Sequence, residues 1–288
     1  MREFGRHFRP DVIALGHADV IRPETIAAMR EDNPSVKVLQ WNFDPLFAGD
    51  DASSDDNRRR ILAKIEVVDA TFVTTAGEVP REFAGARRIA GFMPNPVDLA
   101  IERGRNFEKT DLPRDVFFAA GFGDDKRFHC GMWRHVDTFC RDIQAALPEA
   151  VFSFHGVLGR AHVWGTAYED ALLSCRMGLN MSRRNDIPLY SSDRISHLAG
   201  NGLVVLIDRA TRYGTLFGED EFAFYSSEAE LFETIARLKR DDAKRRAMAE
   251  AGWRRYHALF DSRIVGQYML DALYGEHDPA KYEWPTLV

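Results

Sequence analysis

Short apolar segments alternate along the chain with segments of helical periodicity. The apolar runs are continuous rather than alternating, as expected of parallel strands that are covered on both faces. We expect strands over residues 11–18, 36–41, 70–75, 88–93, 115–122, 151–156, 176–182, 202–208 and 221–227. We expect helices over residues 23–32, 55–69, 130–149, 166–175, 193–201 and 228–240, with a long helical tail from Asp241. This order predicts an α/β architecture with parallel sheets.

One proposed helix has a well-defined apolar face. Over residues 130–149, the side chains of Trp133, Val136, Phe139 and Ile143 recur at helical spacing. We therefore expect these four side chains to face a core together.

A proline-rich segment interrupts the alternation once. Residues 93–115 contain Pro94, Pro96 and Pro113, and prolines stiffen a chain and stop helices. We interpret this segment as an interdomain connector between about four strands and about five. The predicted domains are residues 1–95 and 96–265, with a C-terminal helix and tail over 266–288. Two such sheets facing each other would form a cleft, with the connector as its hinge.

The composition excludes several classes of protein. Lys plus Arg is 38 and Asp plus Glu is 44, so the net charge of −6 argues against general nucleic-acid binding. The three cysteines show no CxxC spacing, which argues against a disulfide scaffold or a structural zinc site and fits a reducing compartment. We see no signal core and no apolar run long enough to cross a bilayer. We expect a soluble cytoplasmic protein, with peripheral membrane contact left open.

The richest candidate site lies in residues 182–208. Ligands of open α/β sheets bind outside the carboxyl ends of the strands. Here a strand end is followed by Tyr190, Ser191, Ser192 and Arg194 at the entry of a short helix. Backbone N–H groups, hydroxyls and an arginine together suit a pyrophosphate without metal. Alternatively, Ser192 is only a helix cap and Arg194 a surface ion pair, and the spacing does not decide between these readings.

A second candidate follows the strand predicted from Asp115. Glycines after the strand lead to Lys126 and Arg127, which would offer further cations to the same site. Neither a dinucleotide fingerprint nor a Walker A sequence is present, so an epimerase or dehydrogenase ranks last. His155 ends a strand and either lines the site or is a satisfied, partly buried histidine. We interpret Trp164 as a packing residue.

The first half of the chain offers candidates for a general base. His17 and Asp19 follow one predicted strand, and Asp44 follows the next. A carboxylate or imidazole there could deprotonate a sugar hydroxyl. Asp44 and Asp19 are also good turn formers, which is the competing interpretation. His129, Cys130 and His135 lack an i, i+4 ligand pair, so we expect no metal site on this predicted helix.

With these motifs in hand, the chain resembles a GT-B glycosyltransferase. It is similar to the group 1, spore-maturation-protein-like branch of nucleotide-sugar transferases. The resemblance covers most of the chain, and the run from Tyr190 is its most specific part. It is carried by QWNFDPL from Gln40, FMPNPVD from Phe92, RMGLNMSR from Arg176, YSSDRISHLAGNGLVVLID from Tyr190 and FAFYSSEAELFETI from Phe222.

The resemblance implies two Rossmann-like domains, with the nucleoside-diphosphate-sugar donor held mainly by the second and the acceptor mainly by the first. It implies a last helix that returns to the first domain and no cofactor besides the donor. The acceptor would be a glycan, a lipid-linked glycan or a protein. Ser191, Ser192 and Arg194 would face the donor phosphates, and Gly202 would close the turn beside them.

The sequence departs from this family in two places. Many retaining relatives hold the nucleotide ribose with a Glu where this chain has His197, and a second Glu eight positions earlier is Leu189 here. The E-x7-E pattern is therefore absent, and retention or inversion stays open. Relatives also carry an extra strand–helix unit before the first strand, which indicates a reduced first domain or a shortened chain. A non-catalytic sugar-nucleotide-binding or partner-binding module is the alternative function.

Overall fold

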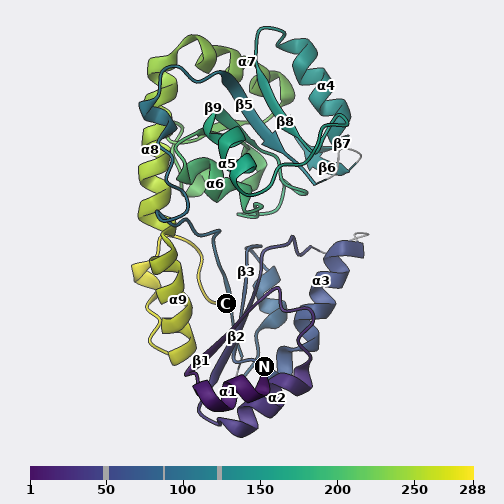
Figure 1. Ribbon diagram of the computed structural model, residues 1–288, viewed down its shortest axis with the longest axis vertical. Coiled ribbons are helices and arrows are strands. Elements are labelled where there is room, and N and C mark those ends of the chain that lie inside the picture. The colour runs from purple at the N-terminus through teal and green to yellow at the C-terminus, as the bar shows by residue number, and fades with distance from the viewer. Residues whose placement is uncertain (48–51, 87, 122–124) are drawn as a thin grey trace. The chain divides into compact units, whose positions relative to one another are not determined.

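The chain folds into two compact units in a computed structural model, which describes residues 1–47, 52–86, 88–121 and 125–288. One unit comprises Met1–Pro94 together with Arg263–Val288, and the other comprises Asn95–Ser262 (Figure 1). The chain therefore passes between the units twice, after Pro94 and after Ser262. The C-terminal tail belongs to the same unit as the N-terminal strands.

A parallel four-stranded sheet forms the centre of the first unit. Its spatial order is β1-β2-β3-β4, so strands that are consecutive in sequence are neighbours throughout. Its strands are β1 (Val12–Gly16), β2 (Lys37–Asn42), β3 (Ala70–Val73) and β4 (Ile89–Phe92). The four strands predicted for the first half of the chain are confirmed.

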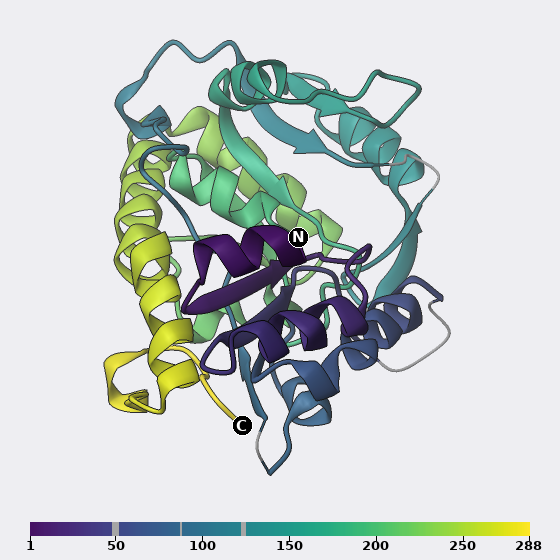
Figure 2. The ribbon, with the colours of Figure 1, turned by 60° about the horizontal axis from the view of Figure 1, so that its bottom comes forward.

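Two apolar clusters lie on one face of the first sheet, because the register places Val38 and Val73 on the same side. One cluster contains Ile13, Ile26 and Val38, and the other contains Ile61 and Val73. On the opposite face Phe72 is buried against Tyr268 of the C-terminal tail, so both faces are covered, which explains the continuous hydrophobic runs. The helices of this unit up to β3 are α1 (Arg2–Phe8), α2 (Pro23–Asp32) and α3 (Ala52–Ala63) (Figure 1 and Figure 2). Two 3-10 turns, η1 (Ile65–Val67) and η2 (Val79–Phe83), lie on either side of β3.

The C-terminal tail packs on this sheet and pairs antiparallel with its edge strand β4. In α9 (Ser262–Tyr274), the fully buried ring of Tyr268 meets the ring of Phe72 edge-on, with centroids 5.4 Å apart. Further along, the Phe92 N–H donates to the carbonyl of Thr286 and the Val288 N–H donates to that of Ala90, each at 3.1 Å. These contacts hold the tail within the unit of the N-terminal strands.

A parallel five-stranded sheet forms the centre of the second unit, in the order β11-β10-β9-β5-β8. Its strands are β5 (Arg114–Ala119), β8 (Phe152–His155), β9 (Cys175–Asn180), β10 (Val204–Asp208) and β11 (Ala223–Tyr225). From β5 the chain moves to β8 on one side and then returns to β9 on the other. The strand order therefore reverses between β5 and β9, as in doubly wound folds.

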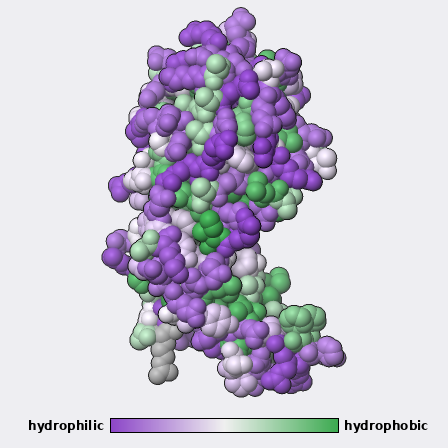
Figure 3. Space-filling model, turned by 90° about the vertical axis from the view of Figure 1, so that its left-hand side faces the viewer, coloured by the Kyte–Doolittle hydropathy of each residue, from purple (hydrophilic) through white to green (hydrophobic). Residues whose placement is uncertain are grey.

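Helices and loops enclose this second sheet around one large apolar core, which includes Val116, Phe118 and Leu206. The helices are α4 (Val136–Ala146), α5 (Thr166–Leu173), α6 (Arg194–Gly200), α7 (Glu228–Arg240) and α8 (Asp242–Phe260). Figure 3 looks onto α8 and shows mainly hydrophilic side chains there, as its mixed charges predict. Among the described residues, no helix combines the length and apolar character that crossing a membrane requires.

The helix predicted over residues 130–149 begins later than expected. Residues before Val136 form an antiparallel hairpin of β6 (Lys126–His129) and β7 (Met132–His135). The turn residues Cys130 and Gly131 have φ values of 48° and 79°, which a right-handed helix does not accommodate. The expected core position of Trp133 is therefore wrong, because its side chain lies on β7 and is half exposed.

The proline-rich segment is mostly a packed part of the second unit. The Val97 N–H donates to the Phe260 carbonyl at 2.9 Å, and the side chain of Asn106 donates to the carbonyl of Cys175 at 2.8 Å. Phe107 and Leu112 are buried. The interpretation of residues 93–115 as a connector is therefore too broad, since apolar residues among the prolines anchor the segment.

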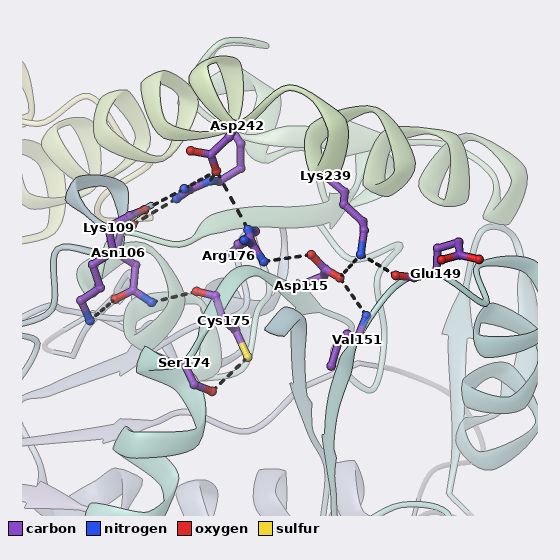
Figure 4. A network of polar contacts seen from close by, with 11 residues as sticks. Asn106, Lys109, Asp115, Glu149, Val151, Ser174, Cys175, Arg176, Lys239 and Asp242 are labelled. Atoms are coloured by element: carbon purple, nitrogen blue, oxygen red, sulfur yellow. Dashed lines mark hydrogen bonds and ion pairs between the residues drawn. The ribbon is translucent and has the colours of Figure 1, made fainter. Parts of the chain in front are cut away.

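A polar network fixes the amino edge of the second sheet (Figure 4). The carboxylate of Asp115, at the start of β5, accepts from Arg176 of β9 at 3.2 Å and from Lys239 of α7 at 2.7 Å. It also accepts from the Val151 N–H before β8 at 2.8 Å. Three strands and one helix are thus tied together at the edge opposite to the one where such sheets bind ligands.

Candidate functional site

The reversal of strand order between β5 and β9 marks the point where a doubly wound sheet binds ligands. At this point the chain leaves β5 at Ala119 and leaves β9 at Asn180. The first sheet has no such reversal among its described strands, because its neighbours are consecutive. The topology therefore predicts a ligand-binding site at the carboxyl edge of the second sheet.

A pocket of about 300 Å³ lies at this edge. Its lining comes from the end of β5, the end of β8, the loop before α5, and the starts of α5 and α6. The lining residues are Ala119, Ala120, Gly121, His155, His162, Val163, Trp164, Gly165, Tyr168, Asp193 and His197. This volume lies at the lower end of the range of small-molecule sites.

His197 is paired with a carboxylate that the sequence reasoning missed. Its Nδ1 lies 2.9 Å from Oε1 of Glu102, which is almost fully buried. Burial disfavours the imidazolium, but the hydrogen bond to Glu102 and the charge of Asp193 outweigh it, and the pKa of His197 is raised. With Nδ1 held by Glu102, Nε2 is the nitrogen left to meet a ligand. Glu102 lies within the proline-rich segment, which carried no signal of a site.

Two arginines are buried close to the reversal point. Arg194 donates to the Ala119 carbonyl at 2.8 Å and to the Met181 carbonyl at 3.3 Å, so it joins the ends of β5 and β9. Arg127 also donates to the Met181 carbonyl. Both guanidinium groups lie over the ring of Phe118, 5.2 Å and 5.6 Å from its centroid.

Neither guanidinium group forms a hydrogen bond with a carboxylate in the described part of the chain. The partners of Arg127 and Arg194 in the described part of the chain are carbonyl and hydroxyl oxygens, not carboxylates. Burial, together with the charge of Arg194, lowers the pKa of Arg127 to about 9, so the group is still charged at neutral pH. Buried charges are normally paired, and an anion binding nearby would relieve the repulsion between them.

The segment before α6 is packed more tightly than its hydroxyls suggested. Ser191 is fully buried and its hydroxyl bonds with the side chain of Asn180, so its expected contact with a phosphate is wrong for this conformation. Ser192 is partly exposed, and its hydroxyl accepts from Arg194 at 3.1 Å. Tyr190 is buried and does not line the pocket.

Gly202 does not lie beside the phosphate site that the resemblance implied. It follows α6, at the amino edge where β10 begins, whereas Arg194 begins α6 at the carboxyl edge. Its φ is +72°, and an added Cβ would lie 2.6 Å from the ring of Phe107. Gly202 is therefore required by backbone conformation and close packing, and its assignment to donor binding is wrong.

The remaining predictions for the second unit have mixed outcomes. His155 lines the pocket and is also bonded to the Ser153 hydroxyl at 3.0 Å, so both interpretations of it hold. Burial and the charges of Arg114 and Arg160 lower the pKa of His155. Lys126 is exposed on β6 and is not among the pocket residues. Residues 122–124 of the glycine-containing turn lie outside the described residues.

Trp164 also differs from its expected role. Its side chain is 77% exposed, so the interpretation of Trp164 as a packing residue is wrong. It lines the pocket, and its ring stacks with that of His162 at a centroid distance of 6.1 Å. An exposed indole at a pocket is a suitable surface for stacking an aromatic ligand.

The three candidates in the first unit lie near one another at the carboxyl ends of β1 and β2. His17 Nδ1 is 3.8 Å from the Asp44 carboxylate, and the ring of His17 stacks with that of Phe43. Asp19 instead pairs with Arg60 at 2.9 Å. The hollow that His17 and Asp19 help to line measures only about 10 Å³. The three residues predicted from the sequence therefore lie in one polar cluster, in which Asp19 forms an ion pair with Arg60.

Comparison with known proteins supports the fold assignment. Residues 134–271 match a family model described as glycosyl transferase-like. A search of curated proteins returns no match.

Several solved structures share the fold. An α-glucosyltransferase in complex with UDP and DNA has a TM-score of 0.62 at 12% identity, over 92% of this chain and 80% of that one. HepE of Anabaena, in complex with UDP and glucose, has a TM-score of 0.56 at 10% identity, over 95% and 80%. Sucrose-phosphate synthase from Thermosynechococcus elongatus has a TM-score of 0.53 at 15% identity, over 96% and 75%.

At these identities the structural likeness concerns the fold, whereas the family match concerns residues 134–271. The matched residues include α6, β10 and most of the pocket-lining positions described above. The chain thus has an α/β fold with parallel sheets that matches the fold of GT-B glycosyltransferase structures, and its residues 134–271 are similar to a glycosyl transferase-like family.

Proposed function

We propose that this protein is a glycosyltransferase that moves a sugar from a nucleoside-diphosphate sugar to a hydroxyl acceptor without a metal ion. The single observation that carries the proposal is the pair of buried guanidinium groups of Arg127 and Arg194, hydrogen-bonded to carbonyl and hydroxyl oxygens rather than carboxylates, at the reversal point of the second sheet. Leaving-group diphosphate develops negative charge during transfer, and fixed positive charges at that place would stabilise it.

Three further observations support a nucleotide-sugar donor at this pocket. Its rim offers the exposed indole of Trp164 for a base. Gly165 precedes the first turn of α5 and has no side chain to cap it, which leaves backbone N–H groups for an anion. The solved neighbours named above include proteins in complex with UDP, which is the same ligand class.

For the acceptor, we propose that the first unit supplies the base. His17 and Asp44 are the preferred candidates, because Asp19 is occupied by Arg60. An imidazole beside a carboxylate is a suitable arrangement for accepting a proton from a hydroxyl. Glycans, lipid-linked glycans and proteins are all acceptors of this chemistry.

A non-catalytic nucleotide-binding module is the second candidate. It is favoured by Leu189, which is buried where many relatives carry a glutamate, and by the small size of the hollow near His17. This alternative predicts nucleotide affinity without turnover.

The deciding experiment is calorimetry with UDP, GDP and dTDP in the presence of a chelator, followed by assays of donor hydrolysis and transfer. We expect one nucleotide to bind without metal and its sugar conjugate to turn over. Turnover should fall in Asp44→Asn and His17→Ala while donor affinity stays unchanged, and Asp56→Asn, an exposed change on α3, serves as control. Binding without turnover would select the second candidate, and the absence of binding by all three nucleotides would refute both.

The His197–Glu102 pair predicts how donor affinity depends on pH. A positively charged His197 attracts a diphosphate, and Glu102 raises its pKa. This contribution is fully present below the usual histidine pKa of about 6.5 and is lost as the pH rises through the raised value. We therefore expect UDP-glucose, which has no terminal phosphate to titrate, to bind roughly fivefold more weakly at high pH.

Calorimetry between about pH 5.5 and 8.5 measures this profile. In Glu102→Gln the decline should move to lower pH, because the raising partner is lost. His162→Asn is the matched control for the other histidines of the pocket, among which burial lowers the pKa of His155. A profile that is identical in wild type and Glu102→Gln would show that His197 does not contact the diphosphate.

A further inference from the structure

A second cluster of ligand-type side chains lies outside the pocket, where the β6–β7 hairpin turn meets the end of β10. His129, Cys130 and Asp208 each present one donor atom, and these atoms lie within 4.8 Å of one another. His129 and Asp208 are buried, and Cys130 is partly exposed. None of the three lines the pocket described above.

The cluster contains buried polar atoms that lack partners in the described structure. His129 is 0% exposed and its Nδ1 has no hydrogen-bond partner, although Oδ2 of Asp208 lies 3.9 Å away. The hydroxyl of Tyr225 is likewise buried and without a partner, and its ring packs edge-on against His129 at 5.5 Å. Buried polar groups are nearly always satisfied, so two such atoms together indicate a missing ion or water.

The backbone holds the carboxylate and the thiol in place beside His129. Oδ2 of Asp208 accepts from the Cys130 N–H at 2.8 Å, and Oδ1 accepts from the Ala210 N–H at 2.9 Å. Cys130 has a φ of 48°, a left-handed turn position that glycine or asparagine would occupy with less strain. The turn conformation therefore does not explain why a cysteine occupies position 130.

The spacing and chemistry of these donors suit a zinc ion. His129 Nδ1, which lacks a partner, lies 3.9 Å from Oδ2 of Asp208, and two such ligands of tetrahedral zinc are separated by about 3.3 Å. Cys130 Sγ lies 3.6 Å from the other ring nitrogen, Nε2, so binding at Nδ1 requires the partly exposed cysteine side chain to rotate. A thiolate, an imidazole and a carboxylate are all preferred zinc ligands, and a water would fill the fourth position within reach of a hydroxyl such as that of Tyr225.

We propose that His129, Cys130 and Asp208 bind one zinc ion that clamps the β6–β7 turn to the end of β10. The ion would neutralise the Asp208 carboxylate and a Cys130 thiolate, and the thiol proton would be released to solvent on binding. Since the ligands join the hairpin to the sheet, zinc should also raise the thermal stability of the protein. This site is separate from the proposed donor chemistry, which uses no metal.

Equilibrium competition between the full-length, untagged protein and a chromophoric zinc chelator tests the proposal. We expect one zinc per chain, with binding about 100-fold or more weaker in Cys130→Ser and Asp208→Asn. Cys140→Ala removes a different thiol and should bind zinc as the wild type does. Thermal unfolding of each variant without metal checks that it is folded.

Cobalt substitution supplies a readout that does not depend on the variants. Cobalt bound by wild type should show a thiolate-to-cobalt charge-transfer band, and UDP affinity should be the same with and without zinc. Less than one zinc per chain, a cobalt spectrum without that band, or equal zinc binding by wild type and a folded Cys130→Ser would overturn the proposal.

Discussion

Replacing Arg127 with glutamine is expected to weaken UDP binding about 10- to 100-fold, because the variant loses a charge-assisted hydrogen bond worth about 1.5–3 kcal/mol. Arg127 is buried, donates to a single carbonyl and has no carboxylate partner in the described chain. An anion that binds here would therefore displace no carboxylate hydrogen bond of Arg127. Arg194→Gln should have a similar effect on affinity. It should also reduce stability, because Arg194 joins Ala119 to Met181.

Calorimetry with UDP and with uridine separates a phosphate effect from a general one. Affinity for UDP should fall in both variants, whereas affinity for the uncharged nucleoside should change little. Arg254→Gln, which removes an exposed guanidinium of α8, is the matched control. If UDP binds Arg127→Gln and Arg194→Gln as tightly as wild type, the diphosphate does not bind at this place.

Replacing Asp115 with alanine is expected to destabilise the second unit by about 3–5 kcal/mol. The Asp115 carboxylate is 1% exposed and accepts from Arg176, Lys239 and the Val151 N–H. Its removal leaves two cations and one backbone donor without their shared acceptor at the start of three strands. Breaking a partly buried ion-pair network in this way costs far more than breaking an exposed pair.

Urea unfolding measures this loss as the change of midpoint at constant slope. Glu250→Ala removes the exposed partner of Arg254 on α8 and should cost less than about 1 kcal/mol. Donor affinity of folded Asp115→Ala should match wild type, since Asp115 lies at the amino edge of the sheet. A destabilisation no larger than that of Glu250→Ala would show that the network is solvated and contributes little.

The strands and most helices were predictable from local pattern. Continuous apolar runs correctly predicted strands of both sheets, because strands buried on both faces need no polar alternation. The local pattern gave a wrong prediction at Trp133, because the apolar residues just before Val136 fit a helix as well as they fit a strand. The turn at Cys130 and Gly131 makes this segment a hairpin rather than a helix. Nothing in the sequence indicates that a cysteine adopts a left-handed backbone conformation there.

The candidate site was only partly predictable. Arg127, Arg194 and His155 were identified because they follow strand ends or begin a helix, whereas His197 came from the family resemblance. The structure places all four around the same edge of the second sheet. Glu102 was missed, because its contact with His197 spans 95 residues. Gly202 was wrongly assigned to the phosphate site. It is close to that segment in sequence, but it lies beyond the opposite end of α6.

By itself, the sequence determined the class of this protein: two parallel α/β sheets, a polar segment after Ser182 and a resemblance to nucleotide-sugar transferases. These properties depend on residue types and on spacings shorter than one strand or helix. The tertiary structure alone decided that Arg127 and Arg194 share Met181 and lack carboxylates, and that Glu102 orients His197. The physical reason is strand order: β5 and β9 are neighbours although β8, which pairs on the other side of β5, comes between them in the sequence, and local sequence does not encode that arrangement.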